Sequence, residues 1–356
     1  MSGAGIVHTI TLAGRQIGPG FPCFIIAEAG VNHNGDVSLA HQLIDAAAEA
    51  GVDAVKFQTF DPAELSAPAA ARAEYQAENT GQSGSQLDML QSLVLPRDAY
   101  PALARHASER GLLFLSTPFD RGSADFLRAL GVLAFKVSSG DLTNLPFLEY
   151  LAGIGLPILL STGMSTLEEV EESVSAIRVS GSPPLALFHC VSNYPAAPED
   201  CNLRAMATLR ETFDVPVGWS DHTDGVDISI AAAALGANLL EKHFTLDRSL
   251  PGPDHKASLE PDELRTMVAA VRRVESALGD GVKQPTTSEI PIAALGRRSL
   301  HWRESLPAGT AVAAEHFTSL RPGTGLSPAR QSSLLGKRLA HPVNAGDMVN
   351  SKDFVE

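Results

Sequence analysis

Eight short apolar runs, separated by stretches rich in alanine, constrain the fold of this chain more than any other feature. The runs have the length of buried strands, and the stretches between them have the length of helices. Such alternation is typical of parallel strands joined by helical crossovers. We predict strands at 24–29, 54–60, 112–117, 134–139, 157–162, 185–191, 216–220 and 238–244, and helices that include 39–50, 99–110, 167–179 and 228–235.

Eight strand–helix repeats within about 250 residues predict a (β/α)8 TIM barrel. A doubly wound sheet is the alternative, but no Gly-x-Gly-x-x-Gly motif follows a predicted strand. Residues 7–22 predict a β-hairpin before the barrel, and the long connection at 61–95 predicts a lid or a substrate-contact segment. We expect a barrel domain at 1–278 that ends in a helix at 261–278, a polar linker at 279–291 and a small β-rich domain at 292–356.

Charge and cysteine content exclude several classes of protein. The 356 residues carry a formal net charge of −14, and a nucleic-acid-binding protein needs a basic face for phosphate contacts. Three cysteines do not form a disulfide framework, which indicates a reducing compartment. The sequence has neither a signal-peptide pattern nor an apolar segment of membrane length. We therefore expect a cytoplasmic protein that contacts neither nucleic acid nor membrane.

Polar side chains follow almost every predicted strand at the point where it ends. In a (β/α)8 barrel these ends meet on the face that carries the functional groups. The last strand delivers Glu241, Lys242 and His243 in a row, and such buried charges are unfavourable unless they are paired or bind a ligand. A rigid turn then ends in the carboxylate of Asp254. The other polar strand ends include Glu28, Lys56, Gln58, Thr117, Lys136, Ser139, Asp141, Ser161, Ser192, Tyr194, Ser220 and His222.

Two of these strand-end lysines, together with several hydroxyl groups, predict a pocket for a phosphorylated anion. Lysine acts as a point charge for phosphate, and serine is a short hydrogen-bond donor. The alternative is that Lys56 and Lys136 pair with Glu28 or Glu241 only to stabilise the barrel interior. This alternative leaves the hydroxyl groups without a common purpose.

His222 and His243 end adjacent predicted strands and can meet at one cation. Neutral imidazole binds metals such as Mn²⁺, Co²⁺ or Zn²⁺. With few protein ligands, such a metal keeps open positions for water and a substrate carbonyl, on which it acts as a Lewis acid. A single histidine is more often a core residue, but a pair on neighbouring strand ends favours a metal site.

Short motifs at the predicted strand ends carry a family resemblance. They are Ile-Ala-Glu-Ala-Gly-Val-Asn-His-Asn-Gly (26–35), Val-Lys-Phe-Gln-Thr (55–59), Ser-Thr-Pro-Phe-Asp (116–120), Phe-Lys-Val-Ser-Ser-Gly-Asp (135–141), Leu-Ser-Thr-Gly-Met (160–164), His-Cys-Val-Ser-Asn-Tyr-Pro (189–195), Trp-Ser-Asp-His-Thr (219–223), Glu-Lys-His-Phe-Thr (241–245) and Pro-Gly-Pro-Asp (251–254). They cover the whole barrel in order, and the chain resembles the sialic acid synthases, which are nonulosonate synthases that use phosphoenolpyruvate. The tail around Arg-Pro-Gly-Thr-Gly (321–325) resembles their small antifreeze-like (SAF) domain.

The resemblance implies a condensation of phosphoenolpyruvate with the open-chain aldehyde of N-acetylmannosamine. C3 of phosphoenolpyruvate attacks the aldehyde, water adds at C2, and the C–O bond breaks to give N-acetylneuraminate and phosphate. The resemblance also implies a homodimer in which the small domain crosses over to the partner's active site. Matching positions put Lys56, Thr117, Lys136, Ser139, Ser161, Ser192 and Ser220 around phosphoenolpyruvate, Gln58, Asp141, Tyr194, Asp254 and Arg321 at the sugar, His222 and His243 on Mn²⁺ (or Mg²⁺ or Co²⁺), and Glu28 at proton transfer.

Several features leave the acceptor sugar open. The insert motifs Ala-Glu-Tyr-Gln (73–76) and Gln-Leu-Asp-Met-Leu (86–90) resemble synthases of the legionaminate type, which act on 2,4-diacetamido-2,4,6-trideoxymannose. Ser138 stands where many relatives have Gly, and Asp141 where several bacterial relatives have Glu. A synthase for a sugar phosphate needs a second basic cluster, which the sequence does not show. A carbohydrate-binding or ice-binding protein needs no buried lysines beside a metal site.

Overall fold

The computed structural model describes residues 9–72, 76–77, 79 and 84–355. Residues 7 and 8 of the predicted hairpin, and residues 73–75 of the Ala-Glu-Tyr-Gln motif, lie outside this part of the chain. Contacts divide the chain into two compact units, Met1–Gly279 and Asp280–Glu356, and each is described by itself. In the described residues, no helix has both the length and the apolarity needed to cross a membrane.

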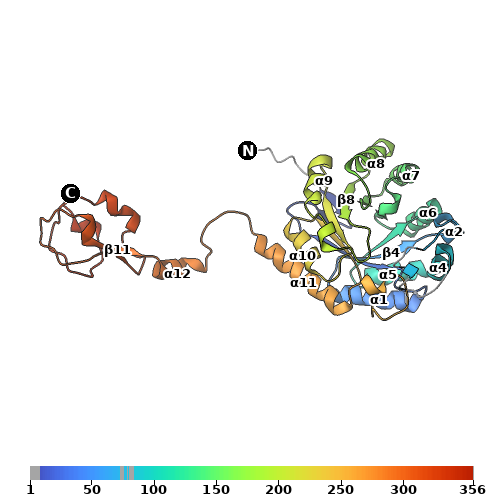
Figure 1. Cartoon of the computed structure of the whole chain (residues 1–356), viewed down its shortest axis with the longest axis horizontal. Coiled ribbons are helices and arrows are strands. Elements are labelled where there is room, and N and C mark those ends of the chain that lie inside the picture. The colour runs from blue at the N-terminus through green and yellow to red at the C-terminus, as the bar shows by residue number, and fades with distance from the viewer. Residues whose placement is uncertain (1–8, 73–75, 78, 80–83, 356) are drawn as a thin grey trace. The chain divides into compact units, whose positions relative to one another are not determined.

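The first unit is a sheet of eight parallel strands with helices around it (Figure 1). Strands pair in chain order from β3 to β5 and from β6 to β10, and β10 pairs back with β3. The two outermost strands of this order, β5 and β6, contact each other, so the sheet curls into a nearly closed barrel. This topology confirms the predicted (β/α)8 fold. The strands are β3 (Phe24–Gly30), β4 (Ala54–Thr59), β5 (Leu113–Pro118), β6 (Phe135–Val137), β7 (Ile158–Ser161), β8 (Leu185–Cys190), β9 (Val217–Asp221) and β10 (Leu239–His243).

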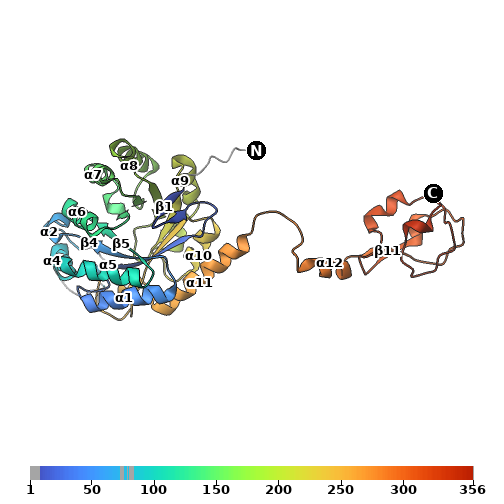
Figure 2. The same ribbon diagram turned by 180° about the vertical axis from the view of Figure 1, so that it is seen from behind.

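Helices cover the outside of the barrel, as both views show (Figures 1 and 2). Local signals set their ends. Helix α8 begins with a capping box, in which Thr166 and Glu169 each accept the other's backbone N–H. The helices of this layer are α1 (Val37–Ala50), α5 (Tyr100–Glu109), α6 (Arg121–Leu130), α7 (Leu145–Ile154), α8 (Leu167–Ser180), α9 (Ala205–Phe213), α10 (Asp227–Ala234) and α11 (Pro261–Leu278). Short 3-10 helices follow at η1 (Arg97–Ala99), η2 (Ser139–Asp141), η3 (Pro198–Asp200) and η4 (His255–Ala257).

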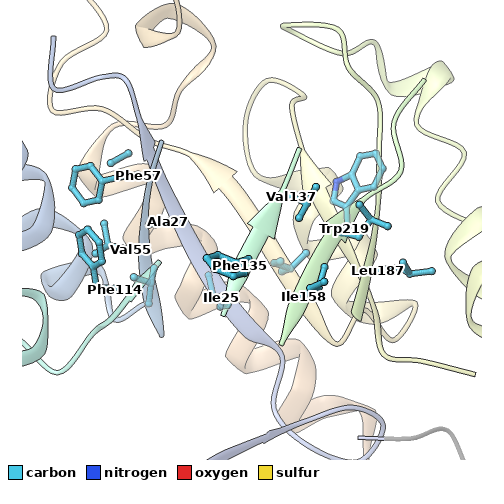
Figure 3. Close-up of a cluster of buried hydrophobic side chains, with 14 of the residues drawn as sticks. Ile25, Ala27, Val55, Phe57, Phe114, Phe135, Val137, Ile158, Leu187 and Trp219 are labelled. Carbon is cyan, nitrogen blue, oxygen red and sulfur yellow. The ribbon is translucent and has the colours of Figure 1, made fainter. Parts of the chain in front are cut away.

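Successive residues of each strand pack into two different apolar clusters, because strand side chains alternate between the two faces. Ile25 and Ala27 of β3 belong to the large cluster between the strands and the helices, which includes Trp219 (Figure 3). Phe24 and Ile26 belong to a second cluster, formed almost entirely by strand residues inside the barrel. The antiparallel hairpin of β1 (Ile10–Leu12) and β2 (Arg15–Ile17) adds Ile10, Leu12 and Ile17 to this inner cluster. The interior at the start of the strands is therefore apolar and filled.

The long connection after β4 packs near the opposite ends of the strands. It contains α2 (Pro62–Leu65) and α4 (Gln86–Ser92). Met89 and Leu90 of α4 are buried against Val31 and Phe60, which directly follow β3 and β4. This segment therefore stands beside the carboxyl ends of the strands, where the sequence predicts the active site.

The second unit has a small apolar core that includes Leu300, Trp302 and Phe317. Its regular elements are α12 (Glu289–Gly296), β11 (Ser299–Trp302), η5 (Ala314–His316), β12 (Phe317–Leu320), η6 (Pro328–Ser333) and η7 (Ser351–Asp353). Helix α12 begins inside the segment 279–291, which the sequence predicts as a polar linker. The prediction missed the reciprocal bonds of Thr286 and Glu289, whose side chains each accept the other's backbone N–H and so favour a helix start.

Candidate active site

The polar side chains at the strand ends alternate between the inside and the outside of the barrel, as the apolar side chains do. Glu28 continues the inward series of β3 and pairs in register with Lys56 on β4 and His243 on β10. Glu241 lies two residues before His243 and faces the same side, opposite Ser220 of β9. These side chains therefore converge above the apolar interior, on the face where TIM barrels carry their chemistry.

Two buried lysines and two buried carboxylates form the centre of the site. Lys56 is ion-paired with Glu28, and its Nζ lies 3.8 Å from Oε1 of Glu241. Lys136 Nζ lies 3.3 Å from the same Glu241 oxygen, and all four side chains are at most 5% exposed. The lysines thus do pair with the carboxylates, as the alternative interpretation required. Buried ion pairs add little net stability, however, so stabilisation alone is a weak reason for four charges here.

The two carboxylates have different proton affinities. Burial raises the pKa of Glu28 to about 7, against the attraction of Lys56 and with a further upward contribution from Glu241. Burial alone would also raise the pKa of Glu241, but Lys136 and Lys56 hold it below its usual value. Environments that push two carboxylate pKa values apart are typical of acid–base chemistry. Glu28 can therefore exchange a proton near neutral pH while Glu241 stays ionised.

Hydroxyl groups surround the lysines. Thr117 Oγ1 accepts a hydrogen bond from Lys56 Nζ at 3.0 Å, and Ser220 Oγ donates to Glu241 Oε1 at 3.3 Å. Ser161 Oγ is buried and has no hydrogen-bond partner within the described chain. A buried hydroxyl of this kind fits a site whose partner is a ligand, because an unpaired buried polar group is unfavourable.

Three further side chains converge on one glycine. Gly163 donates its N–H to Ser139 Oγ at 2.9 Å. A Cβ at Gly163 would lie 2.4 Å from Ser192 Oγ, 2.7 Å from Cys190 Sγ and 2.9 Å from Ser139 Oγ. Such distances are too short for any side chain, so the glycine keeps the two serine hydroxyls together. The cradle of Ser139, Gly163 and Ser192 suits an anion with several oxygens.

The two predicted metal ligands stand side by side with Tyr194. The ring centroids of His222 and His243 are 5.5 Å apart. His222 Nδ1 lies 2.6 Å from the carbonyl oxygen of Val191, and its Nε2 lies 2.9 Å from the Tyr194 hydroxyl. His243 Nδ1 is buried without a partner in the described residues. Within that same part of the chain, no three or more His, Cys, Asp or Glu side chains are grouped to hold a metal.

The histidine pair nevertheless fits a divalent cation with few protein ligands. Burial lowers the pKa of His222 to about 4, although the Val191 carbonyl and Glu241 oppose the shift. Burial also lowers the pKa of His243 well below its usual value, and the nearby His222 adds to this. Both rings are therefore neutral near pH 7, and neutral imidazole is the form that binds metal. Two imidazoles leave further positions for substrate oxygens and water.

Gln58 connects the histidines to the charged centre. Its Nε2 donates to Glu28 Oε1 at 3.2 Å. A Cβ on Gly30, whose φ is +53°, would lie 3.2 Å from Glu28 Oε1 and 3.5 Å from both Gln58 Nε2 and His243 Cε1. Three predicted site residues thus meet around one glycine, and a side chain there would separate them.

The two predicted acidic sugar contacts both follow barrel strands: Asp141 ends η2, which comes after β6, and Asp254 directly precedes η4, which comes after β10. Burial raises the pKa of Asp141, although hydrogen bonds from Ser138 and Asn144 lower it. Burial raises the pKa of Asp254 to about 6. Asp254 is held through its main chain, because its carbonyl accepts from Ser258 Oγ at 2.7 Å.

Asn32 ties the loop of Asp254 to strand β10. Its Nδ2 donates to Ser258 Oγ at 2.9 Å and to the carbonyl of Phe244, the residue after His243, at 2.8 Å. One buried amide therefore links the metal side and the proposed sugar side of the site.

Arg321 belongs to the second unit. Its Nε donates to the carbonyl of Gly296, the last residue of α12, at 3.0 Å, and the side chain is exposed. The guanidinium is thus partly engaged within its own unit. Its remaining N–H groups are still suited to a ligand.

Models of known protein families match both units of the chain. A model of the NeuB family matches residues 43–283, which is more than half of the 356 residues. The chain belongs to the NeuB family. A SAF domain model matches residues 297–355. Relatives that match most of its length are named synthases, so the chain is an enzyme rather than a carbohydrate-binding or ice-binding protein.

Relatives of this NeuB-family chain make related sugar acids. The N,N'-diacetyllegionaminic acid synthase of Legionella pneumophila is 46% identical over 92% of this chain and 94% of its own length. The enzyme of the same name from Campylobacter jejuni is 45% identical over 88% of this chain and 94% of its own length. A crystal structure of N-acetylneuraminic acid synthetase from Leptospira borgpetersenii, in complex with citrate, has a TM-score of 0.71 and 36% identity over 80% of this chain and 95% of that one.

Sequence reasoning missed two groups of this NeuB-family site. Glu241 is among the predicted polar strand ends but has no predicted role in the site, although it has the same parity along β10 as His243 and so faces the site. Lys242 has the opposite parity and pairs outside the site with Asp221 at 3.2 Å. Gly163 gave no signal beyond its motif, because its role depends on side chains from other strands.

Proposed function

We propose that this enzyme is a nonulosonate synthase of the legionaminate type. It condenses phosphoenolpyruvate with the open-chain aldehyde of 2,4-diacetamido-2,4,6-trideoxymannose and with water, and it releases N,N'-diacetyllegionaminate and phosphate. The observation that carries the reaction is the convergence of Lys56, Lys136, Glu28 and Glu241 beside His222 and His243. The two lysines supply charge for an anion, and the paired imidazoles supply a cation site for a carbonyl.

The choice of acceptor rests on the relatives. The sequence motifs put N-acetylmannosamine first and the diacetamido sugar second. Identity is 46% and 45% to the two legionaminic acid synthases but 36% to the N-acetylneuraminic acid synthetase. This difference favours the second acceptor, and N-acetylmannosamine becomes the alternative.

The hydroxyl cradle and the lysines suit the phosphorylated substrate. Lys56 and Lys136 face its charged groups, while Ser139, Ser192 and the unpartnered Ser161 offer hydrogen bonds to phosphate oxygens. Glu241 holds both lysines in place through ion pairs. When the anion binds, its negative charge takes over part of the neutralisation of the two lysines that the carboxylates otherwise provide.

Glu28 is suited to move the proton of the attacking water. C3 of phosphoenolpyruvate bonds to the aldehyde carbon, and water adds to the electron-poor C2. Glu28, with a pKa of about 7, accepts a proton from that water, and the new alkoxide takes one up. The C2–O bond to phosphate then breaks, and phosphate leaves with the bonding electrons and takes up the proton that the C2 hydroxyl loses as it becomes the keto group.

A divalent cation, which we take to be Mn²⁺, would be held by His222 and His243 and would supply Lewis-acid polarisation of the aldehyde when bound. The exposed Arg321 suits the acetamido carbonyls of the sugar. We extend the proposal to a homodimer in which each second unit brings Arg321 to the partner's barrel.

Phosphate release tests the proposal. The purified enzyme is assayed with phosphoenolpyruvate, Mn²⁺ and one acceptor at a time: the diacetamido sugar, N-acetylmannosamine, or a sugar phosphate. We expect kcat/KM to be at least about tenfold higher with the diacetamido sugar, which is about 1.4 kcal/mol of transition-state discrimination. A higher value with N-acetylmannosamine would overturn the acceptor, and no phosphate release with any acceptor would overturn the reaction.

A further inference from the structure

Tyr194 lies beside both histidines, and its ring contacts each of them. Its ring centroid is 4.1 Å from that of His222, with a tilt of 31°, and 5.5 Å from that of His243, with the rings edge to face at 84°. Its hydroxyl lies 2.9 Å from His222 Nε2. The hydroxyl is therefore next to one ring nitrogen of the histidine pair.

The Val191 carbonyl determines which nitrogen of His222 carries the proton. A carbonyl oxygen only accepts, and it lies 2.6 Å from Nδ1, so Nδ1 is the N–H. The neutral ring then has its lone pair on Nε2, and the Tyr194 hydroxyl must be the donor in that contact. A metal that binds His222 needs the same lone pair, because the other nitrogen is committed to the backbone.

We propose that Tyr194 is a positioning residue that occupies the metal-binding lone pair of His222 until a cation displaces its hydroxyl. The inference rests on the proposed cation site at His222 and His243. The hydroxyl keeps the buried Nε2 hydrogen-bonded when no metal is bound, which avoids the penalty of an unpaired buried acceptor. It also holds the ring in the tautomer and orientation that the metal requires. Cation binding must then compete with one hydrogen bond.

The direction of the change in metal affinity distinguishes competition from metal ligation by the phenol. If the hydroxyl competes, its removal makes cation binding stronger. If the hydroxyl is itself a ligand, its removal makes cation binding weaker. A packing role alone leaves the affinity unchanged, because phenylalanine keeps the ring.

The experiment compares Mn²⁺ binding to the metal-free wild-type enzyme and to the Tyr194→Phe variant by electron paramagnetic resonance titration. We expect the variant to bind Mn²⁺ about fivefold more tightly, which is about 1 kcal/mol for one neutral hydrogen bond. Tyr150→Phe is the matched control. It removes an exposed tyrosine hydroxyl that donates a hydrogen bond to Asp125. The control should bind Mn²⁺ as the wild type does.

A second measurement uses the unaltered chain, so the inference can be tested even if the variant does not fold. Zn²⁺ is added to the wild-type enzyme, and the absorbance of its tyrosines is recorded as a difference spectrum. We expect a change in tyrosine absorbance that saturates with one Zn²⁺ per chain, because the Tyr194 hydroxyl loses its hydrogen bond to His222 Nε2.

Each outcome is decisive. Equal or weaker Mn²⁺ binding by Tyr194→Phe, or a Zn²⁺ complex without a tyrosine difference spectrum, overturns the competition while leaving the metal site in place. Failure of the wild-type enzyme to bind Mn²⁺ or Zn²⁺ overturns the cation site and this inference together. The assay of phosphate release would remain a separate test of the reaction.

Discussion

Replacement of Gly163 by alanine should damage phosphoenolpyruvate binding selectively. The new Cβ would lie 2.4 Å from Ser192 Oγ and 2.9 Å from Ser139 Oγ, so at least one hydroxyl must leave its position. A hydrogen bond to a charged group contributes about 1.5–3 kcal/mol. Loss of one such bond would raise the Kd for phosphoenolpyruvate between about tenfold and about 150-fold.

Calorimetric titration of phosphoenolpyruvate into the Gly163→Ala variant measures this change directly. Gly140→Ala is the matched control, because its Cβ would meet Ser138 Oγ at an ordinary 3.7 Å. Overpacking costs about 1–3 kcal/mol of stability, so a thermal melt of both variants shows whether the fold is retained. An unchanged Kd in a folded Gly163→Ala variant would refute the assignment of this cradle to phosphate.

Four further predictions concern the charged centre, the cation and the second unit. Lys136→Met should raise the KM for phosphoenolpyruvate at least about tenfold and that for the acceptor much less, since it removes a charge beside Glu241; steady-state kinetics with a constant phosphoenolpyruvate KM would contradict this. Because burial raises the pKa of Glu28 to about 7 and the ionised form is the base, kcat/KM should rise with pH through that value. In the Glu28→Gln variant, kcat/KM should no longer rise with pH in this range. If the rise persisted, the titrating group would be another residue. Exhaustive chelation should abolish phosphate release and added Mn²⁺ should restore it, whereas full activity of the metal-free enzyme would exclude a metal role. Lys136→Met and Arg321→Ala should each be nearly inactive alone, yet regain activity when mixed under subunit exchange, because one mixed site has an intact barrel and an intact tail. No recovery on mixing would place Arg321 outside the partner's site.

The barrel was predictable because short apolar runs and alanine-rich stretches in the sequence indicate the lengths of its strands and helices. Each of the eight predicted strands overlaps an observed one. The start of α12 was not predictable, because the polar composition of 279–291 indicated a linker, although Thr286 and Glu289 form a helix-starting pair there. Local composition thus predicts elements well where apolar periodicity is strong and poorly where one side-chain pair decides.

The site was predictable in its residue types but not in its contacts. Strand ends in a parallel barrel must meet, so Lys56, Lys136 and Glu28 could be grouped from the sequence. The separate roles of Glu241 and Lys242 follow from strand parity, which shows only when the register of β10 is known. The contact of Tyr194 with His222 joins loops after different strands, and no local pattern encodes it.

The apolar interior beneath the charged centre has a consequence for the order of events in turnover. Phe24, Ile26 and the hairpin residues fill the barrel below Glu28, so reactants have no passage through that end. Both substrates must enter by the one mouth that the loops surround. In the proposed function the phosphorylated substrate binds against Lys56 and Lys136, which belong to strands, whereas the acceptor contacts Asp254 on the connection after β10. An acceptor that arrived first would stand in the way, so turnover should be sequential, with phosphoenolpyruvate the first to enter.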